Sequence, residues 1–447
     1  MSSEWPIVKL GTLADFQEGY VNPSQRDSSY FDGPIKWLRA TDLNDSVVTN
    51  TTRTLSDKGF KSAGKSAQLF EPGTLAISKS GTIGRLGMLG DYMCGNRAVI
   101  NIKPKQNAVP RYLFFVLRHL RPTIETLAEG SVQKNLYVST LSNLDVPAPP
   151  RDVQQSFADT LGALDDRITL LRETNATLEA IAQALFKSWF VDFDPVRAKM
   201  EGRTPEGMDE ATAALFPDGF ETSELGEVPR GWRVAKVGEV AEVVKGKSYS
   251  SKDLVDSHHT ALVTLKSFER GGGFRMDGFK PYSGAYKPSQ VVSAGDLIVA
   301  YTDVTQAAEL IGKPAVVVGV DEYATLVASL DVGIVRPDER HCGKQFLYGL
   351  FRTDAFQSHT LAHTSGTTVL HLAKDGIGSF AFALPPNELI RSFEVTAAAI
   401  ASRKQTNSDA VRTLSTLRDT LLPRLISGQL RLPEAQAATE AALGGAL

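Results

Sequence analysis

The stretch GFKSAGKS, from Gly59 to Ser66, matches G-x-x-x-x-G-K-[ST], the loop that binds nucleotide phosphates. In such a loop a buried strand leads into the glycines and a helix follows, because the loop amides and the helix N-terminus hold the phosphates. Here the preceding TNTTRTLSDK is polar, and Pro72 and Gly73 end any helix soon after the motif. A P-loop NTPase using Gly59–Ser66 is therefore the alternative prediction, and a glycine- and lysine-containing surface loop near a polyanion is favoured.

Other stretches with chemical potential are incomplete. His359 and His363 in HTLAH are spaced for one helix face, but the glutamate of a zinc-protease signature and a third ligand are missing. GTIGRLG does not have the glycine spacing of a dinucleotide-binding loop. The tetrapeptide [DNS]PP[YFW] of amino-methyltransferases does not occur. We predict no catalytic residue, no metal site and no bound cofactor in this chain.

An internal repeat organises the sequence. WPIVKLGTLADFQEG begins at Trp5, and the similar WRVAKVGEVAEVVKG begins at Trp232, 227 residues later. PAPP ends at Pro150, and FALPP ends at Pro386, 236 residues later. The growing offset indicates insertions in the second copy. We expect the two tryptophans to lie in the cores of two similar globular domains.

A long helical segment follows each proline pair. Apolar residues recur there at alternating steps of four and three, which is typical of a coiled coil. The two series are Phe157, Leu161, Leu164, Ile168, Leu171, Asn175, Leu178, Ala182, Leu185 and Trp189, and Phe393, Ala397, Ile400, Lys404, Asn407, Val411, Leu414, Arg418, Leu421 and Leu425. Each rod would be about 55 Å long. The polar members are expected to fix the register of the paired rods; the alternative is two amphipathic helices on separate cores.

Charge and composition limit the protein class. The chain has 48 basic and 51 acidic residues, so any polyanion-binding surface must be local. Residues 1–150 carry 17 basic and 13 acidic groups, whereas the stretch 191–228 carries 3 and 10 and is interpreted as an acidic linker. Two cysteines without a CxxC pair, no secretory leader and no apolar run of membrane-spanning length predict a soluble cytoplasmic protein that does not contact membranes.

Two blocks carry a family resemblance. QALFKSWFVDFDPVRAK, from Gln183 to Lys199, and LPRLISGQLRL, from Leu422 to Leu432, resemble regions of the specificity subunits of type I restriction-modification systems. IKWLRATDLN, SKSGTIGRLG and AYTDVTQAAELIGKP resemble segments of the target-recognition domains of that family. The alternation of globular domain and long helix is similar to the family over essentially the whole chain.

The resemblance implies an α+β fold in which two target-recognition domains, related by pseudo-two-fold symmetry, are separated by two long antiparallel coiled-coil helices. The expected divisions are target-recognition domain 1 (1–150), long helix 1 (151–191), acidic linker (192–228), target-recognition domain 2 (229–387), long helix 2 (388–428) and a C-terminal tail (429–447).

The same resemblance implies a non-catalytic subunit that recognises a bipartite, asymmetric double-stranded DNA site. It would position two adenine-N6 methyltransferase subunits, and in some assemblies restriction/translocase subunits. S-adenosylmethionine, ATP and Mg would then belong to the partner subunits. A pseudo-symmetric repeat suits two half-sites about one duplex turn apart. A coiled-coil adaptor without nucleic-acid binding remains a further alternative.

Candidate DNA-contacting residues are polar and lie beside glycine, serine or turn residues. They are Lys36, Arg39, Lys79, Thr82, Arg85, Lys134, Asn135, Lys245, Lys247, Tyr249, Lys266, Arg270, Thr302, Asp303, Thr305, Gln306, Thr367 and His371. Arg, Asn and Gln could contact base edges, and Lys is better suited to phosphates. Candidate partner-binding residues are Phe186, Trp189, Phe190, Phe193, Leu421 and Leu425. We expect the four aromatic residues to pack partly near Leu421, Leu422 and Leu425, and to expose the remainder to a methyltransferase subunit.

Overall fold

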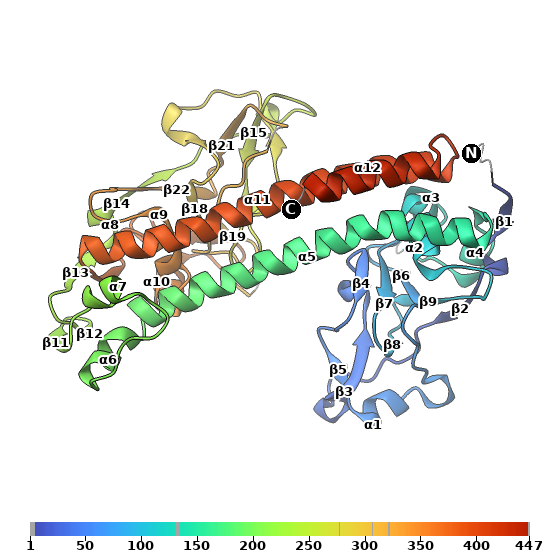
Figure 1. Cartoon of the computed structure of the whole chain (residues 1–447), viewed down its shortest axis with the longest axis horizontal. Helices are drawn as coiled ribbons and strands as arrows, with labels where there is room; N and C mark the ends of the chain where they lie inside the picture. The colour runs from blue at the N-terminus through green and yellow to red at the C-terminus, as the bar shows by residue number, and fades with distance from the viewer. Residues whose placement is uncertain (1–4, 131–133, 277, 306, 321, 446–447) are drawn as a thin grey trace. The chain divides into compact units, whose positions relative to one another are not determined.

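The chain folds into two compact units. The computed structural model describes residues 5–130, 134–276, 278–305, 307–320 and 322–445. The first unit comprises Met1–Glu173 and Ser408–Leu447, and the second comprises Thr174–Asn407. The unit boundary crosses both long helices, α5 (Arg151–Phe190) and α11 (Asn387–Ile426), each 40 residues long (Figure 1). Each unit therefore contains part of both helices, whereas the sequence analysis treated each helix as a separate division.

The first unit is built on a five-stranded sheet. Its strands, in spatial order, are β2 (Ala14–Glu18), β9 (Val99–Pro104), β6 (Leu75–Ser78), β7 (Leu86–Leu89) and β4 (Ser46–Val48). Smaller sheets are formed by β1 (Ile7–Lys9) with β10 (Asp145–Pro147), and by β5 (Thr54–Leu55), β3 (Phe31–Leu38) and β8 (Met93–Gly95). The helices of this globular part are α1 (Asp57–Lys61), α2 (Pro110–His119), α3 (Arg121–Thr126) and α4 (Val138–Ser142).

The second unit contains a four-stranded sheet whose strands correspond to the first four strands of the five-stranded sheet in the first unit. In order, its strands are β14 (Ala241–Lys245), β22 (Val332–Pro337), β18 (Leu297–Ala300) and β20 (Pro314–Val316). A second sheet contains β16 (Lys280–Pro281), β15 (Thr260–Val263), β21 (Thr325–Ala328) and β17 (Val291–Val292). Two smaller sheets are formed by β13 (Arg233–Lys236) with β25 (Ala381–Leu384), and by β19 (Thr302–Asp303), β24 (Leu370–Leu372) and β23 (Thr364–Ser365). The helices are α8 (Val237–Val240), α9 (Lys344–Phe351) and α10 (Asp354–Ala362).

The strand registers confirm the internal repeat. Ala14 lies opposite Pro104 in the β2–β9 pair, and Ala241 lies opposite Pro337 in the β14–β22 pair. The parallel pair β3–β8 of the first unit likewise has a counterpart in the parallel pair β15–β21. The central strands β6 and β18 are buried along their whole length, which explains why both read as apolar runs in the sequence. The two globular parts share one topology, as the sequence predicted.

The two long helices pair antiparallel, as expected. Within the second unit, Asn407 Nδ2 donates to Asn175 Oδ1 at 2.8 Å, Lys404 pairs with Glu179, and the Phe186 ring contacts the Phe393 ring. In the first unit, Arg418 Nη1 donates to Asp165 Oδ1 at 2.6 Å. The polar residues in the apolar seam therefore meet polar partners across the helix pair, which favours one register over its alternatives.

Each long helix also anchors its globular part. The side-chain oxygen of Gln154 on α5 accepts the N–H of Val109 before α2, at 2.9 Å. Glu394 on α11 accepts the N–H of Phe346 in α9 at 2.7 Å. Burial raises the pKa of Glu394, because the charged carboxylate loses water there. The helices consequently pack on the globular parts as well as on each other, and the alternative of helices confined to separate cores is wrong.

The expected position of the aromatic cluster is wrong. Phe186, Trp189 and Phe190 lie in the core of the second unit, at 2%, 5% and 8% exposure, against Phe346 and Phe393. The leucines that were expected beside them, Leu421, Leu422 and Leu425, are buried in the core of the first unit. The antiparallel register causes this separation, because the end of α5 lies opposite the beginning of α11.

The acidic segment 192–228 is folded rather than an extended linker. It contains α6 (Asp194–Met200), α7 (Glu210–Ala214) and a hairpin of β11 (Phe220–Ser223) and β12 (Gly226–Pro229). Its Val196 and Phe216 are buried in the core of the second unit. In the C-terminal segment, α12 (Leu432–Gly445) buries Ala435 in the first core. Trp232 is also buried, and Trp5 packs edge-on against Phe157, which confirms a core role for both tryptophans.

Candidate nucleic-acid interface

The segment Gly59–Ser66 does not form a phosphate-binding loop. Gly59 lies inside the five-residue helix α1, and the side chain of Ser56 accepts the Gly59 N–H at 3.2 Å as the helix N-cap. Gly64–Ser66 forms a 3₁₀ turn, so the motif does not join a buried strand to a following helix. The structure contradicts the P-loop NTPase alternative. The Lys61 and Lys65 side chains are exposed, as expected for a basic surface loop.

The histidine pair likewise gives no metal site. The rings of His359 and His363 stack with centroids 4.0 Å apart, and His359 Nε2 lies 3.1 Å from Ser379 Oγ. Among the residues that the structure describes, no group of three or more His, Cys, Asp or Glu side chains could hold a metal ion.

Three of the candidate cations in the first unit are held by internal partners. Lys36 Nζ lies 2.6 Å from Asp91 Oδ2, and Lys79 Nζ lies 2.6 Å from Glu18 Oε2. Arg39 hydrogen bonds to Thr52, and its backbone N–H donates to Asp42. The hydrogen bond from Lys36 lowers the pKa of Asp91, because it stabilises the carboxylate. These three side chains are already neutralised in part, so they are poorer phosphate ligands than exposed, unpaired lysines.

An open hollow on the first unit brings two candidate residues together with others. It is lined by Glu18, Gly19, Tyr20, Asn22, Lys79, Ser80, Asn96, Arg97, Ala98 and Asn135. The sequence analysis identified only Lys79 and Asn135 among these residues. It missed Arg97, an exposed side chain in the turn between β8 and β9, and Tyr20, which is 49% exposed. Arg97 lies two residues after the end of β8, and Tyr20 lies two residues after the end of β2. Their position beside a strand end was the signal that could have identified them.

Backbone hydrogen bonds from separate segments hold the turn that carries Arg97. The Asn96 N–H donates to Leu38 O at 2.9 Å, and the Lys79 N–H donates to Ala98 O at 2.8 Å. The Gly19 N–H donates to Val99 O at 2.8 Å. A Cβ on Gly19 would lie only 2.0 Å from Asn96 O, so this close approach requires glycine.

The second unit has the same turn. The Ser329 N–H donates to Val263 O at 2.9 Å, the Tyr301 N–H to Asp331 O at 2.8 Å, and the Gly246 N–H to Val332 O at 2.9 Å. A Cβ on Gly246 would lie 2.1 Å from Ser329 O, which repeats the close approach in the first unit. The turn Asn96–Val99 thus corresponds to Ser329–Val332, and Arg97 corresponds to Leu330.

A neighbouring hairpin also repeats. Asn135 bridges to Ser80 and Glu129, and the Leu136 N–H donates to Lys79 O at 2.9 Å. In the second unit, His371 pairs with Thr302 and Ser365, and the Leu372 N–H donates to Tyr301 O at 2.9 Å. Asn135 therefore corresponds to His371, and Lys79 corresponds to Tyr301. We call the surface that carries Lys79, Arg97 and Asn135 the 97 face, and the equivalent surface that carries Tyr301, Leu330 and His371 the 330 face.

Equivalent positions on the two faces carry different side chains. Glu18 and Lys79 form an ion pair in the 97 face. Their counterparts are Lys245 and Tyr301, and the Lys245 ammonium lies 5.7 Å from the centre of the Tyr301 ring. Burial raises the pKa of Tyr301 to about 12, so the ring remains neutral near neutral pH. The two faces thus combine one backbone frame with different hydrogen-bonding groups and charges.

The structure contradicts direct DNA contact by Thr302 and Asp303. Both side chains are buried, at 6% and 0% exposure. The Asp303 carboxylate accepts the backbone N–H groups of Thr305, Leu310 and Ile311 at 2.6, 2.5 and 2.9 Å. Burial alone would raise the pKa of Asp303, but these hydrogen bonds leave it lowered. Asp303 is therefore a structural residue that holds the following loop.

The other candidate residues remain accessible. The exposed ones are Thr82, Arg85, Lys134, Lys245, Lys266, Arg270, Thr367 and His371, and the partly exposed ones are Asn135, Lys247, Tyr249 and Thr305. Arg270 pairs with Glu309 at 3.2 Å, and Gln306 lies outside the described residues. DNA contact by the accessible residues stays a prediction. Of the candidate partner-binding residues only Phe193 is partly exposed, so the burial of the others does not support that role.

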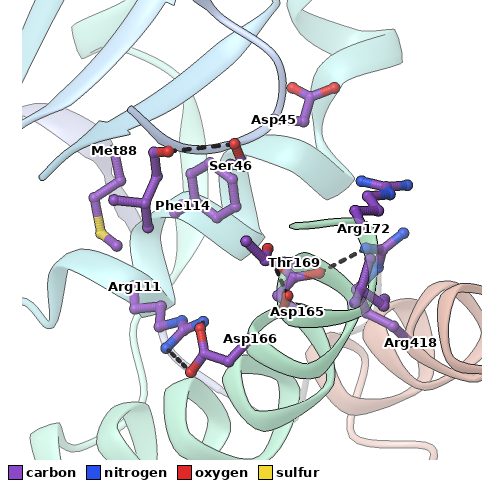
Figure 2. Close-up of a pocket in the computed structure, with 12 residues that line it drawn as sticks. Asp45, Ser46, Met88, Arg111, Phe114, Asp165, Asp166, Thr169, Arg172 and Arg418 are labelled. Atoms are coloured by element: carbon purple, nitrogen blue, oxygen red, sulfur yellow. Dashed lines mark hydrogen bonds and ion pairs between the residues drawn. The ribbon is translucent and has the colours of Figure 1, made fainter. Parts of the chain in front are cut away.

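A small cleft lies where the globular part of the first unit meets α5 (Figure 2). Figure 2 shows two charged pairs in its lining: Arg111 Nη1 donates to Asp166 Oδ2 at 2.9 Å, and Arg418 pairs with Asp165. Burial acts to lower the pKa of Arg418, but its contacts with Asp419 and Asp165 leave it raised. Because these groups satisfy one another, the cleft is a structural contact within the unit.

Comparison with known proteins identifies the class. Residues 2–180 match the family model described as the type I restriction modification DNA specificity domain. A type I restriction enzyme specificity subunit of Methanocaldococcus jannaschii is 24% identical over 96% of this chain and 94% of its own length. One of Haemophilus influenzae is 27% identical over 76% of this chain and 82% of its own length. The matched range contains the first copy of the repeat and most of α5.

The chain is thus similar over nearly its whole length to type I restriction enzyme specificity subunits, and residues 2–180 match their DNA specificity domain. The fold agrees: the crystal structure of a type I restriction-modification S subunit from M. genitalium superposes with a TM-score of 0.52, at 13% identity, covering 95% of this chain and 96% of that one. No helix among the described residues is long and apolar enough to cross a membrane.

Proposed function

We propose that this subunit recognises a bipartite, asymmetric DNA site, with the 97 face on one half-site and the 330 face on the other. One observation carries the proposal: equivalent backbone positions, held by equivalent hydrogen bonds, present Arg97, Lys79 and Asn135 in one unit and Leu330, Tyr301 and His371 in the other. Equal frames would approach DNA in the same way, and different side chains would select different bases.

Exposed cations in each unit support contact with a polyanion. Arg85 and Lys134 are exposed in the first unit, and Lys245 and Lys266 are exposed in the second. Lysines of this kind bind phosphates without regard to sequence, and they position a protein on a duplex. Selection between bases then rests with the side chains of the two faces.

The partner subunits follow from the family rather than from a site in this chain. We propose that two adenine-N6 methyltransferase subunits, and in some assemblies restriction/translocase subunits, bind this chain in the cytoplasm. S-adenosylmethionine, ATP and Mg would be bound by those subunits. The specificity subunit would need no cofactor of its own, because its contribution is to select the DNA sequence.

The test is co-expression of the full chain with the methyltransferase encoded beside its gene, followed by genome-wide mapping of N6-methyladenine. The proposal predicts methylation at one motif made of two different half-sites and a spacer of constant length. A single uninterrupted motif, or two identical half-sites, would contradict it. Methylation that is unchanged when this subunit is omitted would show that the chain does not select the DNA sequence.

A further inference from the structure

We infer that the shared turn position occupied by Arg97 and Leu330 determines base specificity. Arg97 would select a guanine in the first half-site, and Leu330 would select a thymine at the corresponding place in the second. This inference rests on the proposed function, and it assigns base contacts to two residues.

Arg97 is suited to bind one fixed partner outside the chain. Its side chain is exposed and makes no hydrogen bond or ion pair with another residue that the structure describes. Its neighbours Asn96 and Ala98 are tied to Leu38 and Lys79 through backbone hydrogen bonds, and Asn96 Oδ1 also accepts the Ala98 N–H at 3.0 Å. A rigid turn of this kind reduces the conformational entropy that binding removes.

The surroundings of Arg97 favour a base edge over a phosphate. Within the hollow, the positive charge of Lys79 is offset by Glu18 at 2.6 Å, so Arg97 is the one cation of the lining that has no ion-pair partner among the described residues, and no second cation joins it to form a phosphate-binding cluster. The hollow also contains the amide side chains of Asn22 and Asn135. A guanidinium in such a polar setting can donate two hydrogen bonds to guanine O6 and N7, the commonest specific base contact of arginine.

Leu330 has an apolar side chain where Arg97 has a charged one, but the backbone of its turn is held by equivalent hydrogen bonds. It is 41% exposed in the turn whose ends are held by Ser329 and Asp331. A leucine side chain has no hydrogen-bonding group, so the only group it can select in the major groove is the methyl of thymine. The nearby Lys245 is exposed and can hold the adjacent phosphate.

The test is a reciprocal exchange, Arg97→Leu and Leu330→Arg, in the full chain assembled with its methyltransferase, with the methylated sequences as the readout. Arg97→Leu should replace guanine preference by thymine preference at one position of the first half-site and leave the second half-site unchanged. Leu330→Arg should produce the opposite change in the second half-site only. The loss of discrimination expected from removing one bidentate arginine contact is about 5-fold to 150-fold.

Two further variants keep the inference falsifiable. Arg97→Lys retains the charge but loses the paired donors, so it should weaken guanine preference while methylation continues. Arg151→Leu, at an exposed arginine at the start of α5, is the matched control and should change neither sequence nor extent of methylation. If Arg97→Leu abolishes methylation, binding of the purified variant complex to duplexes substituted at each base replaces the methylation readout. Loss of the guanine preference at one position of the first half-site supports the inference, and an unchanged preference contradicts it.

The overturning result is an unchanged recognition sequence in both exchange variants, with or without a uniform loss of binding. Arg97 would then contact phosphate or no DNA at all, and the proposed function would still stand if the unaltered complex methylates a bipartite site. A single or symmetric motif in the unaltered complex would instead remove the proposed function itself.

Discussion

The two globular units carry different side chains on turns that equivalent backbone hydrogen bonds hold. Around Asn96–Val99 and Ser329–Val332, hydrogen bonds from equivalent segments hold equivalent turns, and the glycines Gly19 and Gly246 allow the same close approach. Three equivalent positions on these frames differ in charge or polarity: Arg97 and Leu330, Lys79 and Tyr301, and Glu18 and Lys245. Because the same backbone arrangement carries different side chains in the two units, one fold can present two recognition surfaces. The side chains that set specificity can then change without a change in the backbone that supports them.

The largest loss of stability should come from truncating one buried aromatic side chain in the core of one unit at a time. Phe186→Ala in the second unit and Phe157→Ala in the first each delete a ring that is 2% or 3% exposed. Each should cost about 3–5 kcal/mol of unfolding free energy. Denaturant unfolding followed by limited proteolysis should show that each change sensitises its own unit. Equal sensitisation of both units by either variant would contradict the division into two cores.

The ion pairs between the long helices should differ in strength between the units. Arg418 is 7% exposed, and Arg418→Met removes the shorter ion pair of Asp165 and leaves the one with Arg118 at 3.6 Å, at a cost of about 1.5–3 kcal/mol. Lys404→Met should cost about 1 kcal/mol or less, because the Lys404 side chain is 30% exposed and Tyr348 and Gln183 still donate to Glu179. Thermal unfolding compares the two variants, and equal losses would show that burial does not set the strength of these pairs.

The Asp303 loop should make the second unit more acid-sensitive. The first unit has Gly81 at the position of Asp303, so it has no such carboxylate. Because the pKa of Asp303 is lowered on folding, its contribution is fully present above its unfolded value near 3.8 and is lost as the pH falls toward the folded value. Asp303→Asn should cost about 1–3 kcal/mol at neutral pH and reduce this acid dependence.

Hydrogen exchange at Leu310 and Ile311 can measure that effect directly. Their amides donate to Asp303, so their protection factors, corrected for the intrinsic exchange rate at each pH, should fall in acid and in the Asp303→Asn variant. Unchanged exchange at these amides in the variant would show that the carboxylate does not hold the loop.

The smallest effects should come from exposed lysines. Lys134→Ala and Lys245→Ala should each weaken binding to all duplexes by a similar factor. Each should also lower the slope of log affinity against log salt concentration by about one. Fluorescence anisotropy over a range of salt concentrations measures both quantities. Lys187→Ala, on α5 in an ion pair with Asp192, is the matched control and should leave the slope unchanged. A lysine variant that alters sequence preference would mark a base contact instead.

The sequence predicted the features that depend on local periodicity. The apolar seam, the polar positions Asn175 and Asn407 within it, and the duplicated strands all follow from spacing that the chain shows directly, whereas the hydrogen bond between the two asparagines is known only from the structure. The position of the aromatic cluster did not, because a heptad pattern identifies a seam but not which residue of the partner helix lies opposite. The folding of the acidic segment was also hidden, since its charge masked the few buried apolar residues such as Phe216.

The binding surface was harder to predict because strand pairing creates it. Arg97 is 18 residues from Lys79 in sequence, and β6 and β9 bring the two segments together. Asp303 resembles a surface residue of a polar loop, yet three backbone amides converge on it and bury it. Contacts of this kind depend on tertiary structure, which neither residue type nor spacing reveals.

The most direct test of the central claim is to exchange residues 1–150 for the corresponding segment of a relative with another specificity, and to map N6-methyladenine in cells that express the chimaera with its methyltransferase. We predict that one half-site changes to that of the relative while the other half-site keeps its sequence. A change in both half-sites, or in neither, would contradict the account.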